Sequence, residues 1–378
     1  MTSSTVNLRR TALYDAHLAL GARLIGFGGF EMPVQYAGVL REHDAVRRDA
    51  GLFDLSHMGQ IRLRGAAVGA WADRLTINHV ATMKPWQARY NVFTNERGGA
   101  HDDVIFYRLP DEEWLLVVNA SNARKMWTLL AERRVAGVEL ENRHGRDALV
   151  ALQGPRSVEI LEPLLESDAL RAQIADMKYY TCIRATVAGT PSLLARTGYT
   201  GEDGFELFVE GERAQALWDA LLERGRPAGL IPCGLGARDV LRLEAGMPLY
   251  GHELDEAITP LQAGLGWALK LEKPDFEGKN ALAAQAAAGD YPRIAGFVLE
   301  GRAPARAGYR VFLGDRDVGE VRSGSPAPSL GGRNVGMALV ERAAAAPGTP
   351  IAIEIRGARA PATVTPLPFY VRPSKRKK

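Results

Sequence analysis

The stretch IAGFVLE at residues 294–300 opens the pattern that decides the fold of this 378-residue chain. From here on, short runs of alternating apolar and polar residues are interrupted by Gly, Pro or Asp about every eight to twelve residues. The later runs are YRVFLG (309–314), VGEVRSG (318–324), GMALVE (336–341), PIAIEIRG (350–357) and PATVTPL (361–367). This rhythm is typical of a small all-β barrel or sandwich. We therefore predict a separate β-domain at residues 290–372, entered through a hinge in the poorly patterned stretch 281–292.

Residues 1–280 mix predicted helices and strands without regular βαβ alternation, which favours an α+β architecture over a doubly wound one. The strand predicted at 204–209 places Phe205, Leu207 and Val209 on one face and Glu206 and Phe208 on the other. Further strands are predicted at 114–118 and 148–152, and helices at 38–48, 214–222 and 233–245.

Composition excludes several classes of protein. The chain has 47 Lys and Arg against 44 Asp and Glu, so its net charge of +3 gives no reason to expect nucleic acid binding. The basic residues near the end, within 373–378, are interpreted as a solvated tail. No apolar run is long enough for a membrane helix, so no membrane partner is expected. Cys182 and Cys233 are far apart and lack a CxxC or Cys/His pattern, which predicts neither disulfide nor metal site. The first residues lack a secretory apolar segment, and we expect a cytoplasmic protein.

The first candidate motif is GGAHDD, residues 98–103, before the strand-like VIFYRL. Adjacent residues on a strand point to opposite faces, so one carboxylate could lie beside Ile105 and Tyr107 and hydrogen-bond a reacting amine. Two carboxylates share one site only at high cost, so only one should face a cavity. The pattern alone does not say whether it is Asp102 or Asp103, and a turn with solvated aspartates remains open.

The second motif is RTGYTGEDGFE, residues 196–206. Its glycines resemble a phosphate-binding loop, but neither a dinucleotide nor a Walker pattern is present, and a plain hairpin loop is equally consistent. Glu206 has apolar neighbours, and a half-buried carboxylate needs partners. Adjacent N–H groups of a heterocycle would satisfy it.

The third motif, CGLGARDVLRLEAGMPLYG at 233–251, places Arg238 and Arg242 one helical turn apart. They form either a salt-bridged helix face or a fork for a ligand carboxylate. His57, His101 and His252 lack metal-ligand spacing and are interpreted as surface or core residues. No nucleophile motif appears, which disfavours covalent catalysis.

Together these segments resemble the aminomethyltransferase (T-protein) family of the glycine cleavage system. The resemblance runs from about residue 11 to 372 and includes GLFDLSHMGQIRLRG, TNERGGAHDDVI, VVNASN, RTGYTGEDGFELF and GLGARDVLRLEAG. It implies a three-lobed cloverleaf around a central channel for tetrahydrofolate, with a ferredoxin-like lobe and a C-terminal β-barrel. Residues 1–280 would form the folate-binding region as two interleaved α+β lobes.

The resemblance also implies an activity. An aminomethyl group on the dihydrolipoyl arm of the lipoylated H-protein would give its carbon to tetrahydrofolate, with release of ammonia. Matching the motifs residue by residue assigns the catalytic role to Asp103, pterin binding to Glu206 and a place in the folate site to Arg238. Other positions implied to line the pocket are Met58, Tyr90, Asn119, Tyr199 and Trp267, and Arg372 is implied to bind the glutamate tail of folate.

Two other functions of the same superfamily stay open at this point. One is a folate-dependent demethylase of sulfonium or N-methyl substrates, which shares length and fold. The other is a non-catalytic folate-binding protein, whose KGCYxGQE signature is replaced here by RTGYTGEDG. The GLGARDxLRLEAG string favours the aminomethyltransferase.

Overall fold

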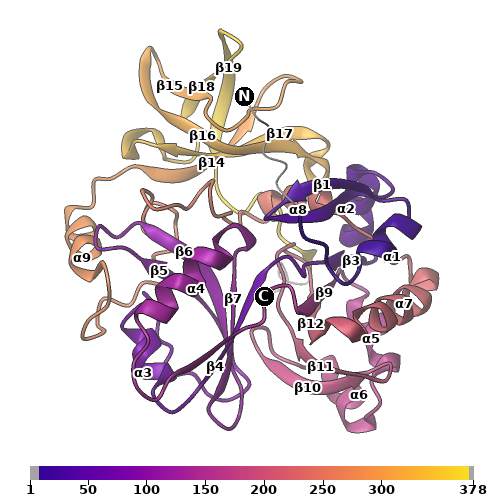
Figure 1. Cartoon of the computed structure of the whole chain (residues 1–378). Coiled ribbons are helices and arrows are strands. Elements are labelled where there is room, and N and C mark those ends of the chain that lie inside the picture. The colour runs from indigo at the N-terminus through magenta and orange to yellow at the C-terminus, as the bar shows by residue number, and fades with distance from the viewer. Residues whose placement is uncertain (1–7, 374–378) are drawn as a thin grey trace, which may run out of the picture.

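The computed structural model describes residues 8–373, which fold into three lobes (Figure 1). Two lobes are each built on an open β-sheet, and the third is a closed barrel of six strands. The α+β class and the C-terminal barrel predicted from sequence are therefore confirmed. The basic segment predicted as a tail lies, beyond Pro373, outside the described residues.

The first lobe contains a five-stranded sheet in the order β5-β6-β7-β4-β8. Apolar residues on alternate positions, such as Ile61, Leu63 and Phe106, pack against two helices and form one core. The elements are β4 (Gly59–Arg64), α3 (Val68–Asp73), β5 (Ala88–Thr94), β6 (Ala100–Arg108), β7 (Glu113–Val118), α4 (Ala123–Glu132) and β8 (Glu139–Asn142). The strand predicted at 114–118 is β7.

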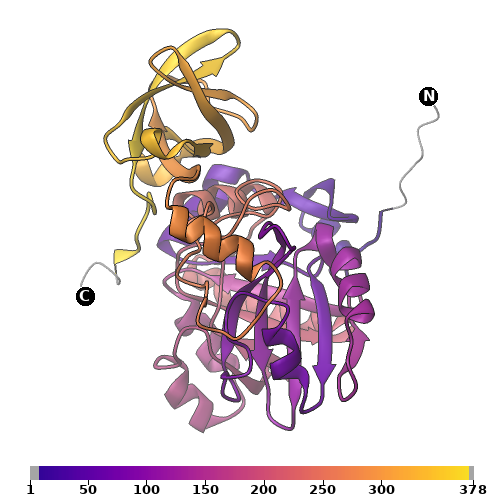
Figure 2. The ribbon, with the colours of Figure 1, turned by 90° about the vertical axis from the view of Figure 1, so that its left-hand side faces the viewer.

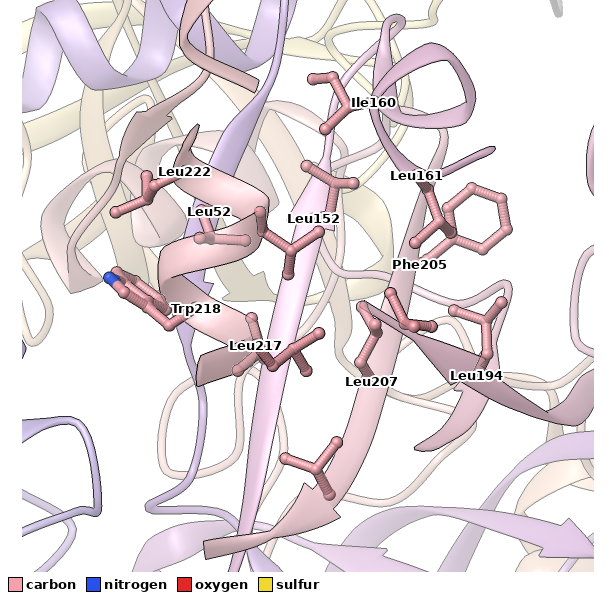
Figure 3. Close-up of a cluster of buried hydrophobic side chains, with 14 of the residues drawn as sticks. Leu52, Leu152, Ile160, Leu161, Leu194, Phe205, Leu207, Leu217, Trp218 and Leu222 are labelled. Atoms are coloured by element: carbon pink, nitrogen blue, oxygen red, sulfur yellow. The ribbon is translucent and has the colours of Figure 1, made fainter. Parts of the chain in front are cut away.

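The second lobe contains a six-stranded sheet in the order β10-β11-β12-β9-β3-β13. Figure 3 shows its core, in which Leu217 and Trp218 of α7 lie over Leu152 and Leu207 of the sheet. The strands are β3 (Gly51–Asp54), β9 (Asp147–Gln153), β10 (Cys182–Val187), β11 (Thr190–Ala195), β12 (Gly204–Glu210) and β13 (Ile231–Pro232). The helices are α5 (Ser157–Leu161), α6 (Asp168–Ile174) and α7 (Ala214–Gly225).

Truncation of one leucine tests how much this core stabilises the lobe. Leu152 is fully buried, so Leu152→Ala leaves a cavity and should lower the free energy of unfolding by about 2–5 kcal/mol. Leu40 is 65% exposed, and Leu40→Ala should change the free energy of unfolding by less than about 0.5 kcal/mol. Urea unfolding of both variants measures the difference. Equal effects would contradict this packing.

The two sheets face each other across a third apolar cluster. On β6 and β12, Tyr107 and Phe208 meet edge to face with ring centroids 5.2 Å apart, and Leu115 and Leu149 pack beside them. Residues of α8 (Leu235–Glu244) close one end of this layer. The hairpin of β1 (Arg23–Phe27) and β2 (Phe30–Gln35) lies near α8, with α1 (Tyr14–Ala19) and α2 (Val39–Arg48) (Figure 1). The predicted helices at 38–48, 214–222 and 233–245 are thus α2, α7 and α8.

The barrel lies above the other two lobes, as Figure 2 shows. Its strands follow the order β14-β17-β16-β15-β18-β19 and enclose their own apolar core. They are β14 (Arg293–Leu299), β15 (Arg310–Leu313), β16 (Arg316–Ala327), β17 (Arg333–Val340), β18 (Pro350–Ile355) and β19 (Ala358–Thr365). Most of the predicted hinge is instead helix α9 (Lys279–Ala288). Alanine favours helix even without an amphipathic pattern, which is why periodicity missed it.

A buried carboxylate joins the barrel to α2 and α8. Glu244 accepts hydrogen bonds from His43 Nε2 at 2.8 Å, Arg47 Nη2 at 2.8 Å and Ser329 Oγ at 2.7 Å. Burial alone would raise the pKa of Glu244, but the hydrogen bond and charge of His43 and the charge of Arg47 outweigh it and lower this pKa to about 2.

Because the pKa of Glu244 is lowered by folding, its carboxylate stabilises the protein above the unfolded pKa, and this contribution is lost as pH falls toward 2. Glu244→Gln should therefore lower the free energy of unfolding by about 3 kcal/mol at neutral pH. The difference in unfolding free energy between the two proteins should narrow as pH falls from about 4.5 toward 2. Urea unfolding at neutral pH and at about pH 3 measures this difference, and a constant difference would refute the assignment.

Candidate active site

A cavity of about 960 Å³ opens where the two sheets, α8 and the barrel meet. Asp103 and Ile105 of β6, Glu206 of β12 and Arg238 of α8 line it on one side. Apolar residues of β14, β17 and β19 line it on the barrel side, Ile294, Met337 and Val364 among them. Its volume lies within the range of small-molecule sites, roughly 300–1,000 Å³.

Eight of the nine site residues predicted from sequence line this one cavity. They are Met58, Tyr90, Asp103, Asn119, Tyr199, Glu206, Arg238 and Trp267. Arg372 is not among the lining residues. Its guanidinium lies over the Tyr179 ring, 5.3 Å from the centroid, and 3.6 Å from Asp203. A role for Arg372 in holding a ligand tail is therefore not supported by its position.

The pleat of β6 decides which aspartate faces the cavity. Asp103, Ile105 and Tyr107 share one face of the strand and all line the cavity. Asp102 has the opposite parity and is completely buried on the other side. Asp103 is thus the carboxylate that a ligand can reach.

Two side chains hold the Asp103 carboxylate. Tyr90 OH donates to Oδ2 at 3.0 Å, and Asn119 Nδ2 donates to Oδ1 at 2.8 Å. Burial raises the pKa of Asp103, and these two hydrogen bonds counteract it. Burial and the charge of Asp103 raise the pKa of Asp102 to about 8. Ionisation of one of the two neighbouring carboxyl groups therefore disfavours ionisation of the other.

Glu206 presents a second carboxylate from the facing sheet. Its Oε2 accepts hydrogen bonds from Thr197 Oγ1 at 2.5 Å and Tyr107 OH at 3.2 Å. Its other oxygen, Oε1, has no hydrogen-bond partner among residues 8–373 and belongs to a residue that lines the cavity. This oxygen can accept N–H groups of a ligand.

The two arginines of α8 have different environments. Arg242 is 1% exposed and is satisfied by Glu253, Asp239 and Ser323, at 2.8, 2.8 and 2.7 Å. Arg238 lies over the Tyr199 ring, 4.6 Å from its centroid, and forms no ion pair with the described part of the chain. Burial lowers the pKa of Arg238. Of the two interpretations of this helix face, the salt bridges hold for Arg242 and the two-arginine fork is not formed. Of the two arginines, only Arg238 is available to an anion.

Aromatic rings form the walls of the cavity. Tyr90 stacks on Trp267 with centroids 5.7 Å apart and planes inclined by 30°. Trp267 is 61% exposed, an unusual surface for a tryptophan without a ligand or partner. Tyr199 OH donates to the Pro248 carbonyl at 2.5 Å, which fixes its ring under Arg238. Flat ligands stack well on such rings.

The glycines of the 196–206 loop serve close packing. A Cβ on Gly198 would lie 2.0 Å from Gln153 Oε1, and Gly201 has a φ of +81°. Arg196 and Asp203 close the loop through a bidentate ion pair. This arrangement supports the hairpin interpretation and places Glu206 at the cavity.

Several lining residues were not predicted from the sequence. His57 is 2% exposed, and burial lowers its pKa to about 4, so it is neutral at physiological pH. Tyr180 also lines the cavity, where burial and the nearby Glu206 raise its pKa to about 12. The position of Tyr107 at the cavity follows from strand alternation, because it lies four residues after Asp103 on the same strand. Tyr180 lies in a turn, where no alternation predicts the direction of a side chain.

Within residues 8–373, no cluster of His, Cys, Asp or Glu could hold a metal ion. No helix in the described chain is long and apolar enough to cross a membrane. The site therefore offers two carboxylates, one unpaired cation and aromatic walls. These groups suit a flat ligand that is rich in N–H donors and carries an anionic end.

Comparisons with known proteins agree with this architecture. The family model described as GCVT N-terminal domain matches residues 13–273, and the glycine cleavage T-protein C-terminal barrel domain matches 293–370. An aminomethyltransferase of Streptomyces coelicolor is 51% identical over 376 residues, covering 98% of this chain and 99% of the relative. One of Symbiobacterium thermophilum is 45% identical, with 98% and 99% coverage.

A solved structure gives the same result. The crystal structure of the glycine cleavage system aminomethyltransferase T from Bartonella henselae is 33% identical and covers 97% of this chain and 99% of its own, with a TM-score of 0.87. The chain therefore belongs to the glycine cleavage T-protein family of aminomethyltransferases, and its activity is that of a one-carbon transferase.

Proposed function

We propose that this aminomethyltransferase takes its carbon from an aminomethyl group on the dihydrolipoyl arm of an H-protein and passes it to tetrahydrofolate. The observation that carries the proposal is the convergence of Asp103, Glu206 and the unpaired Arg238 on one cavity with aromatic walls. Three elements distant in sequence supply these residues. Glu206 Oε1 and the Arg238 guanidinium have no hydrogen-bond or ion-pair partner in the described chain, so both can bind a ligand.

The chemistry of tetrahydrofolate fits these groups. Its pterin ring is flat and carries adjacent N–H donors, which the free Oε1 of Glu206 can accept. Its arylamine and reduced ring provide apolar surface for Tyr90 and Trp267. Its anionic tail can neutralise Arg238, whose charge has no partner in the described chain.

In the proposed reaction, the carbon exchanges its bonds to sulfur and amine nitrogen for bonds to N5 and N10 of tetrahydrofolate. The two protons released from N5 and N10 go to the thiolate and the amine, which leave as thiol and ammonia. Asp103 stabilises positive charge on the reacting nitrogens as the new bonds form. Tyr90 and Asn119 hold the carboxylate in place for this role.

Most of the acceleration is expected from positioning. The cavity holds both reactants in one enclosed space, which replaces an encounter in solution by a reaction within a complex. Burial of Asp103 strengthens its interaction with the developing charge, because the local dielectric is low.

The deciding experiment supplies the protein with aminomethylated H-protein and tetrahydrofolate and follows ammonia. We expect ammonia and methylene-tetrahydrofolate in equal amounts. Release no faster than the rate without the protein would reject the proposal. A parallel arm offers a sulfonium or N-methyl donor in place of H-protein, and turnover only in that arm would identify a demethylase.

A further inference from the structure

The carboxylate of Asp102 has no role in the site as described, yet it is fully buried directly behind the cavity. It accepts three hydrogen bonds, from Asn119 N at 3.0 Å, Asn119 Nδ2 at 2.9 Å and Asn122 Nδ2 at 2.6 Å. Two of these donors belong to Asn119, which lines the cavity. This buried carboxyl group is therefore linked directly to a cavity residue.

The same Asn119 amide also contacts Asp103. Its Nδ2 donates to Asp103 Oδ1 at 2.8 Å and lies 3.0 Å from the Asp103 carbonyl oxygen. An amide nitrogen has two hydrogens to donate, and the Asp103 carbonyl oxygen and carboxylate only accept. A reversed amide would place its oxygen against the carboxylate oxygens, so the network fixes its orientation. Asn119 Oδ1 is left without a hydrogen-bond partner in the described structure.

The charges near this pair are not balanced. Neither Asp102 nor Asp103 forms an ion pair with any described residue. Neither Arg238, which lies over Tyr199, nor Lys125, which bonds to Tyr250 and Glu256, forms an ion pair with either carboxyl group. The Asp103 carboxylate at the cavity and the free carbonyl oxygen of Asn119 thus favour a small cation with several N–H donors.

We propose that Asp102 is a positioning residue that fixes the Asn119 amide, so that Asn119 Oδ1 and the Asp103 carboxylate together bind the protonated amine before it leaves the carbon as ammonia. This inference rests on the proposed function, since the amine is the leaving group of that reaction. A protonated amine, like the ammonium ion of the reverse reaction, only donates hydrogen bonds, which matches a site made only of acceptors. The site holds the amine as it takes up its proton, and the C–N bond then breaks to release neutral ammonia.

The experiment uses the reverse reaction, in which methylene-tetrahydrofolate, reduced H-protein and ammonium are the substrates. In Asp102→Asn one donor of Asn119 or Asn122 loses its acceptor, and the Asn119 amide is displaced. We expect the KM for ammonium to rise by at least about tenfold, with the Kd of tetrahydrofolate within about threefold of wild type.

Asn122→Ser is the matched control. Asn122 donates to the same carboxylate, but it neither contacts Asp103 nor lines the cavity. Its KM for ammonium should stay within about threefold of wild type. An equal rise in both variants would show that Asp102 only stabilises the fold, and an unchanged KM in Asp102→Asn would overturn the proposal.

Two further measurements keep the test independent of folding and turnover. If Asp102→Asn does not fold, Asn119→Ala replaces it, and a normal ammonium KM in that variant overturns the ammonium site. A crystal structure of Asp102→Asn should show Asn119 Nδ2 beyond hydrogen-bonding distance of Asp103 Oδ1. If Asn119 does not move in that crystal structure, the positioning role of Asp102 is refuted. This result does not depend on turnover. Absence of ammonia release by the wild-type protein would refute the proposed function instead.

Discussion

Asp103→Asn should slow turnover by about 10²–10³-fold while tetrahydrofolate still binds, because the lost charge is needed mainly as positive charge develops on the reacting nitrogens. Asparagine has the same shape and can keep one of the two hydrogen bonds from Tyr90 and Asn119. Ammonia release from aminomethylated H-protein gives the rate, and calorimetric titration with tetrahydrofolate gives the Kd.

The control for this variant is Asp219→Asn, the same change at an exposed position of α7 that does not line the cavity. It should leave both the rate and the Kd unchanged. A large loss of tetrahydrofolate affinity in Asp103→Asn, with little effect on the rate once bound, would make Asp103 a binding residue.

Glu206→Gln should weaken tetrahydrofolate binding by about 10²-fold, or roughly 3 kcal/mol. Thr197 and Tyr107 both donate to Oε2, so the glutamine oxygen will take that position. The amide nitrogen must then replace the free Oε1 and oppose the N–H donors of the pterin. Calorimetric titration with tetrahydrofolate measures the change.

Glu210→Gln is the matched variant for this prediction, since Glu210 lies on the same strand at an exposed position. It should bind tetrahydrofolate like the wild-type protein. If Glu206→Gln bound equally well, the pterin would have to lie elsewhere in the cavity.

The short strands of the barrel and strand β12 could be predicted because they alternate in polarity with a period of two, whereas β7 and β9 could be predicted as short continuous apolar runs. The alternation in 204–209 placed Glu206 opposite Phe205 and Leu207, and the structure has Phe205 and Leu207 in the core and Glu206 at the cavity. Helix α9 escaped prediction, because its alanines have strong intrinsic helix propensity but no apolar stripe.

The side-chain partners could not be predicted, because they come from contacts distant in sequence. The family resemblance assigned the site to Arg238, but the charge pattern of GLGARDVLRLEAG by itself does not separate Arg238 from Arg242. The separation follows from Glu253 and Ser323, which reach only Arg242. The contacts of Arg372 with Asp203 and Tyr179 likewise come from residues distant in sequence, which the position near the end of the chain did not indicate.

The sequence alone determined the α+β class, the barrel and the family, because these depend on local periodicity and on long motifs. The strand pattern also predicted that only one of Asp102 and Asp103 faces the cavity, and the family resemblance assigned that place to Asp103. Only the tertiary structure decided the rest: the strand register turned Asp103 toward Ile105 and Tyr107, and Asn119, from the end of the next strand, came to bridge both carboxylates. The charge and hydrogen-bond partners of a side chain depend on which residues lie next to it in space, and these residues are distant in the sequence.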